Sequence, residues 1–123
     1  MEKILIVDDD KDIRDITKKR LMQAGYEVMT ASSGQETFDI CKTNRPDLIL
    51  LDIAMEKMDG YHTCEKIKQD NKTKDIPVLF VTGKELLPEG INKHCQDLGA
   101  CGYISKPFAI KELLERITEI LCP

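Results

Sequence analysis

A small set of polar residues has side chains that could together bind a metal ion and stabilise a phosphoryl group. Each member stands directly after a short run of mostly apolar residues: Asp8, Asp9, Asp52, Thr82 and Lys106. Carboxylates are preferred ligands of hard divalent cations and can also act as nucleophiles. Hydroxyl and ammonium groups stabilise the oxygens of a transferring phosphoryl group. This combination predicts phosphoryl chemistry, provided that the fold brings the side chains together.

The apolar runs before these residues predict strands. They are continuous rather than alternating and rich in β-branched residues, which is typical of strands covered on both faces. The predicted strands cover residues 4–7, 26–31, 48–51, 78–81 and 102–105.

Helical spacing of apolar residues follows each predicted strand. Asp10 is the expected N-cap of the first helix, and Gly25 is expected just past its end. Ser33 and Glu36 have the spacing of a capping box at the start of the second helix. The third helix follows Asp59-Gly60, and the last two are predicted over 88–98 and 110–121.

Five strands that alternate with five helices predict an α/β fold. We expect one domain over residues 1–123, a (βα)5 unit with a doubly wound, five-stranded parallel sheet, right-handed crossovers and helices on both faces. Such sheets bind ligands at the carboxyl ends of their strands. The residues that follow the first, third, fourth and fifth strands should therefore meet at one edge.

The predicted cluster needs a cation. Three carboxylates placed together repel one another, and Lys106 offsets only one of their charges. Mg²⁺ is the simplest addition, because it prefers oxygen ligands and is usually held by one or two carboxylates with phosphate oxygens.

Composition and charge argue against several classes of function. The chain has a net charge of −4, and six of its 22 acidic residues lie within the first fifteen positions. No basic stripe accompanies them, which argues against nucleic acid as a direct ligand. No apolar run approaches the roughly 20 residues of a membrane span, and we expect neither membrane insertion nor a signal peptide. Five scattered cysteines without a CxxC pair indicate thiols in a reducing cytoplasm.

Five separated segments resemble the receiver domain of two-component response regulators, the CheY-like superfamily. They are Ile4–Asp10, Asp47–Asp52, Met55–Gly60, Pro77–Gly83 and Gly99–Phe108. The resemblance spans the whole chain and implies the flavodoxin-like strand order 2-1-3-4-5. Each segment alone would be a weak signal, but the ordered set is specific.

The resemblance also implies a role for each site residue. Asp52 would accept a phosphoryl group, and Asp8, Asp9, Asp52 and the backbone carbonyl of Ala54 would bind Mg²⁺. Thr82 and Lys106 would contact the phosphoryl oxygens. Tyr103 would turn inward as a switch residue, and Lys106-Pro107 would be a cis peptide.

The implied function is a phosphorylation-controlled signalling switch rather than an enzyme. Its partners would be a sensor histidine kinase or a histidine phosphotransfer protein and a downstream effector or output domain outside this chain. The surface around the fourth helix, the fifth strand and the last helix would change on phosphorylation. A pseudo-receiver, which mediates interactions without phosphorylation, is the alternative.

Two enzyme or cofactor classes fit the sequence less well. A haloacid-dehalogenase-type phosphohydrolase would place Thr or Val where Asp12 stands, and 123 residues leave no room for its cap domain. A flavin-binding module would need a phosphate loop after its first strand, where Asp8-Asp9-Asp10 would instead repel phosphate.

Overall fold

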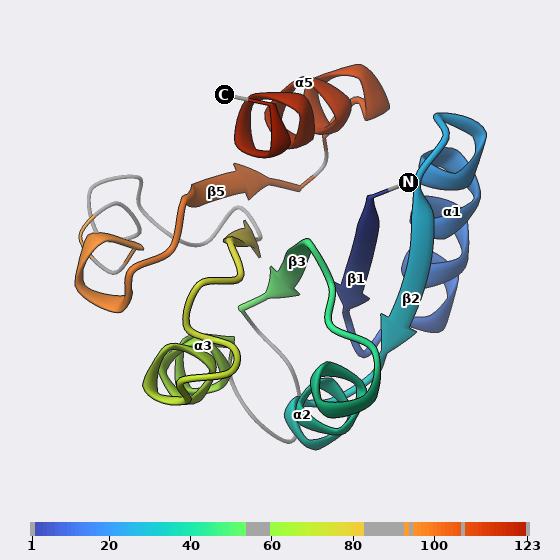
Figure 1. The fold of residues 1–123 in the computed structure, drawn as a ribbon. Coiled ribbons are helices and arrows are strands. Elements are labelled where there is room, and N and C mark those ends of the chain that lie inside the picture. The colour runs from blue at the N-terminus through green and yellow to red at the C-terminus, as the bar shows by residue number, and fades with distance from the viewer. Residues whose placement is uncertain (1, 54–59, 83–92, 94, 107, 123) are drawn as a thin grey trace.

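The computed structural model describes residues 2–53, 60–82, 93, 95–106 and 108–122. Its five strands form one parallel sheet in the order β2-β1-β3-β4-β5 (Figure 1). The strands are β1 (Lys3–Val7), β2 (Glu27–Ala31), β3 (Leu48–Asp52), β4 (Val78–Thr82) and β5 (Gly102–Ser105). The doubly wound sheet and its predicted strand order are confirmed.

Four helices have defined bounds, and they lie on both faces of the sheet (Figure 1). They are α1 (Lys11–Gln23), α2 (Gly34–Thr43), α3 (Gly60–Gln69) and α5 (Ile110–Leu121). Of the predicted fourth helix, residues 95–98 are helical, and positions 88–92 and 94 lie outside the described residues.

Side chains that alternate along the strands pack into two separate cores, one on each face of the sheet. In β1, Leu5 and Val7 belong to the core that also contains Cys41 of α2 and Ile67 of α3. Ile4 and Ile6 point to the other face, in a core shared with Leu21 of α1 and with Leu113 and Ile117 of α5. Burial on both faces explains why the strand sequences are continuously apolar.

The ends of α1 follow the sequence signals. The Asp10 side chain accepts hydrogen bonds from the backbone N–H groups of Asp12 and Ile13. At the other end Gly25 has a φ of +99°, its N–H donates to Met22 O, and the N–H of Tyr26 donates to Leu21 O. This pattern is a Schellman motif, and it holds Tyr26 outside β2. The strand therefore starts at Glu27, one residue later than predicted.

The start of α2 differs in one detail from a capping box. The Ser33 hydroxyl caps the helix by accepting from Glu36 N at 3.2 Å, as expected. The Glu36 carboxylate, however, accepts hydrogen bonds from Ser32 rather than from Ser33. The donors are the Ser32 hydroxyl at 2.6 Å and the Ser32 backbone N–H at 3.3 Å. These bonds lower the pKa of Glu36.

Three of the five cysteines fill core positions, whereas Cys101 and Cys122 are exposed. Burial raises the pKa of Cys64 to about 11. No helix among the described residues is both long enough and apolar enough to cross a membrane.

Candidate functional site

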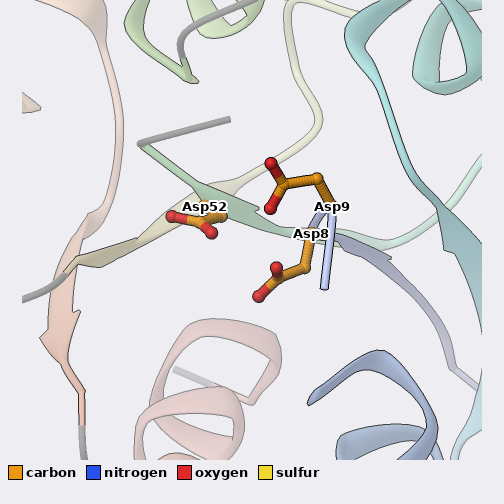
Figure 2. A group of neighbouring side chains, drawn as sticks. All are labelled: Asp8, Asp9 and Asp52. Carbon is orange, nitrogen blue, oxygen red and sulfur yellow. The ribbon is translucent and has the colours of Figure 1, made fainter. Parts of the chain in front are cut away.

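Three carboxylates meet at the carboxyl edge of the sheet. Asp8 and Asp9 follow β1, and Asp52 ends β3, the strand that pairs with β1. One carboxylate oxygen from each residue lies within 4.8 Å of the others, and Figure 2 shows the three side chains facing a common space. The predicted convergence of these three residues is therefore present in the structure.

Backbone contacts fix Asp8 in place. Its N–H donates to Ala31 O at 3.1 Å, which extends the β1–β2 pairing, and its Oδ1 accepts from Asp10 N at 2.9 Å. The Arg14 guanidinium, one turn into α1, donates to the Asp8 carbonyl oxygen at 2.7 Å. The Asp8 residue is only 4 % exposed. These bonds orient the loop that also carries Asp9.

The surroundings of Asp52 depend on a glycine. The N–H of Gly60, the first residue of α3, donates to Ile53 O at 2.6 Å. A Cβ at position 60 would lie 2.6 Å from Ile53 Cα and closer still to the Asp52 carbonyl oxygen. Only glycine allows α3 to begin this close to the end of β3, where Asp52 is 7 % exposed.

Lys106, which follows β5, joins two of the carboxylates. Its Nζ lies 2.9 Å from Asp8 Oδ2 and 3.3 Å from Asp52 Oδ2. Burial alone would lower the pKa of Lys106, but the hydrogen bonds and charges of the two carboxylates outweigh it and raise the pKa. The ammonium group is therefore charged at neutral pH.

The charge balance of this cluster favours a divalent cation. Three carboxylates and one ammonium group leave an excess of two negative charges. The converging donors are all carboxylate oxygens, which suits Mg²⁺, and Asp9 is exposed, which leaves a path from solvent. The residues present thus fit the predicted metal.

The structure describes the other predicted site residues only in part. The backbone of Thr82 ends β4 beside Ser105, and its neighbour Val81 pairs with Asp52. The Thr82 side chain, the Ala54 carbonyl and the peptide bond to Pro107 lie outside the described part of the chain. Tyr103 lies in β5, is half-buried and packs against the core beneath α2 and α3.

Two contributors to the site were missed from the sequence. Arg14 falls in an ordinary helical stretch, and only its position one turn after Asp10 could have suggested a bond back to the loop. Gly60 was expected just before the third helix, but it is the first residue of α3 and lies close to the Asp52 backbone.

Comparisons with known proteins agree with this geometry. The model of the response regulator receiver domain family matches residues 4–118. The "Probable transcriptional regulator ycf27" of Guillardia theta is 42% identical over 98% of this chain and 45% of its own length. The "DNA-binding dual master transcriptional regulator RpaA" of a Synechocystis strain is 38% identical over 98% of this chain and 49% of its own length. The chain thus spans about half the length of these relatives.

Two solved structures match over nearly their full length. The chemotaxis protein CheY4 of Vibrio cholerae superimposes with a TM-score of 0.91 at 33% identity, covering 98% of this chain and 99% of that chain. The N-terminal domain of a response regulator receiver protein from Methanoculleus marisnigri has a TM-score of 0.79 at 42% identity, covering 100% and 98%. With its parallel sheet and its acidic edge, this chain belongs to the response regulator receiver domain family of two-component signalling systems.

Proposed function

We propose that this receiver domain is a phosphorylation-controlled switch whose phosphoacceptor is Asp52. The observation that carries the proposal is the convergence of Asp8, Asp9 and Asp52 with Lys106 at one edge of the sheet. Asp52 ends the central strand β3, and its carboxylate is held beside a fixed positive charge. This is the arrangement that a carboxylate nucleophile needs when an anionic phosphoryl group approaches.

The donor in this proposal is the phosphohistidine of a sensor kinase or a phosphotransfer protein. An Asp52 oxygen attacks phosphorus, the new O–P bond forms an acyl phosphate, and the N–P bond breaks with its electron pair returning to the imidazole. Lys106 neutralises charge on the phosphoryl oxygens, and Thr82 donates to one of them. Asp8, Asp9, Asp52 and the Ala54 carbonyl would hold Mg²⁺, which would supply further charge neutralisation.

The response to phosphorylation is a shift between two arrangements of the surface formed by the fourth helix, β5 and α5. Thr82 ends β4 beside the end of β5, the strand that carries Tyr103, so a movement of Thr82 toward the phosphoryl group acts on a neighbouring strand. Tyr103 is the proposed switch side chain. The domain assists its own phosphorylation and dephosphorylation, yet its role is signalling rather than turnover of a substrate.

The output would come from another protein or from a domain outside this chain. Relatives about twice as long are described as transcriptional regulators, which supports an output of that kind. The kinase, the receiver domain and the output would work in the cytoplasm.

Intact-mass spectrometry after incubation with acetyl phosphate and Mg²⁺ tests the proposal. The wild-type chain should gain the mass of one phosphoryl group, and Asp52→Asn should gain none. Asp39→Asn, an exposed aspartate on α2, is the matched control and should behave like the wild type. No gain in the wild type would favour the pseudo-receiver instead, and equal gain in Asp52→Asn would show that Asp52 is not the phosphoacceptor.

A further inference from the structure

A groove separate from the acidic site runs between α2 and α3 and the turn that follows α3. Its volume is about 800 Å³. On the α2 side its lining residues from Gln35 to Lys42 form one helical stripe, and Arg45 lies just past the end of the helix. At the helical rise of 1.5 Å per residue, this stripe is about 10 Å long.

The floor of the groove is apolar. Phe38 is half-buried and packs against the core, and the Cys41 beside it is 7 % exposed. Burial raises the pKa of the Cys41 thiol, and the nearby charge of Arg45 opposes this shift. The floor therefore offers contact to an apolar side chain, with a guanidinium close by.

The rim of the groove is strongly basic. Lys42 and Arg45 line it from the α2 side, and Lys66 and Lys72 line it from the α3 side. Asp70 is the single acidic residue of the lining, and its Oδ1 already accepts a hydrogen bond from the backbone N–H of Lys72. Within the part of the chain that the structure describes, none of the four cations belongs to an ion pair.

This concentration of positive charge runs against the rest of the molecule. The lining carries four cations and one carboxylate in a chain whose net charge is −4. Unpaired cations around an apolar floor attract anions and favour partners that combine carboxylates with an apolar anchor.

We propose that the α2–α3 groove binds an acidic, amphipathic helical segment of a partner protein. Carboxylates of the segment pair with Lys42, Arg45 and Lys72. One apolar side chain contacts Cys41 and the edge of the Phe38 ring, one face of which lies under Lys66. About two turns of helix match the length of the stripe on α2. The groove shares no residue with the acidic site, so this contact does not require phosphorylation.

Two observations favour a peptide over a nucleic acid. The Lys66 ammonium lies 5.7 Å from the centroid of the Phe38 ring and covers its face, where a base would otherwise stack. A nucleic acid strand longer than the groove would also extend its negative charge along a chain whose net charge is −4. A short acidic segment keeps its charge within the groove.

Fluorescence polarisation tests this proposal with a labelled synthetic helical peptide that has glutamates on one face and leucines on the other. The wild-type chain should bind the peptide at low ionic strength and lose affinity as salt is added. Replacing the glutamates by glutamine, or the leucines by serine, should each weaken binding. Asp52→Asn should bind as well as the wild type, which separates this test from that of the phosphoacceptor.

Charge-reversal variants locate the site. Lys42→Glu/Arg45→Glu and Lys66→Glu/Lys72→Glu should each weaken binding about 10-fold or more. Lys19→Glu/Lys111→Glu makes the same change in net charge on α1 and α5 and should bind within about 2-fold of the wild type. Circular dichroism and urea unfolding establish that the variants are folded.

Several results would overturn the proposal. One is the absence of binding by the wild type, and another is an equal loss in the control variant, which would reflect net charge alone. A third is tighter binding of a single-stranded DNA oligonucleotide than of the peptide through the same four cations, which would make the partner a nucleic acid.

Discussion

The Lys106 ammonium lies 2.9 Å from Asp8 Oδ2, although the two residues are 98 positions apart in the chain. The same nitrogen lies 3.3 Å from Asp52 Oδ2. One cation from the end of β5 therefore compensates two carboxylates, from the ends of β1 and β3, which are 4 % and 7 % exposed. This bridge offsets part of the repulsion between the carboxylates when no metal is bound.

Removing this cation should destabilise the metal-free protein. Lys106→Met removes the positive charge beside two buried carboxylates, and we expect the free energy of unfolding in urea with EDTA to fall by about 2 kcal/mol. This expected loss is smaller than the loss on breaking a fully buried ion pair, since water reaches part of the lysine side chain. Lys111→Met, an exposed lysine on α5, is the control and should change stability little. Equal stability of the two variants would contradict the role of Lys106.

Neutralising Asp9 should have the opposite effect without metal. Asp9→Asn removes one of three mutually repelling carboxylates, so the Tm in EDTA should rise by a few degrees. The increase in Tm on adding Mg²⁺ should then be much smaller than in the wild type, because a metal ligand is lost. Asp12→Asn on α1 should show neither change. A full Mg²⁺ response in Asp9→Asn would remove Asp9 from the metal site.

A methyl group at position 60 should disturb the phosphoacceptor. Gly60→Ala forces α3 away from the backbone of Asp52 and Ile53, and we expect about 2 kcal/mol less stability and slower phosphorylation by acetyl phosphate. Gly25→Ala is a matched control, because its φ of +99° also strains an alanine, at a cost of about 1 kcal/mol, but far from the site. It should be phosphorylated at the wild-type rate. A normal rate in Gly60→Ala would show that this close approach has no effect on the chemistry.

The buried thiol of Cys64 should make stability depend on alkaline pH. Its pKa is raised from 9.0 to about 11, since burial disfavours the thiolate. Between about pH 9 and pH 11 the unfolded chain therefore loses this proton while the folded chain keeps it, and stability decreases as the pH rises. The loss should be about 2 kcal/mol at most, measured by urea unfolding across this range.

Cys64→Ala removes the titrating group and serves as the control for this pH dependence. Its stability should be lower at neutral pH because of the cavity, but it should fall less steeply between pH 9 and pH 11. The same slope in variant and wild type would assign the pH dependence to other groups, including the buried Cys41 and Cys95, whose pKa values are also raised by burial.

Much of the fold could be predicted because local patterns and tertiary structure agree. The apolar runs, the Asp10 cap and Gly25 set the strand and helix ends within about a residue of their observed positions. The convergence of Asp8, Asp9, Asp52 and Lys106 also followed from sequence, because the strands of a parallel sheet end at the same edge.

Other contacts were decided by tertiary structure alone. The bond from Arg14 to the Asp8 carbonyl and the closeness of Gly60 to Asp52 depend on how helices dock on strands, and residue types do not encode that distance. The basic groove is the clearest case. Its four cations are spread over 31 positions of a sequence without a basic stripe, and they meet only because α2 and α3 pack on the same face of the sheet. Sequence determines which residues can end a strand or cap a helix, whereas packing decides which distant charges become neighbours.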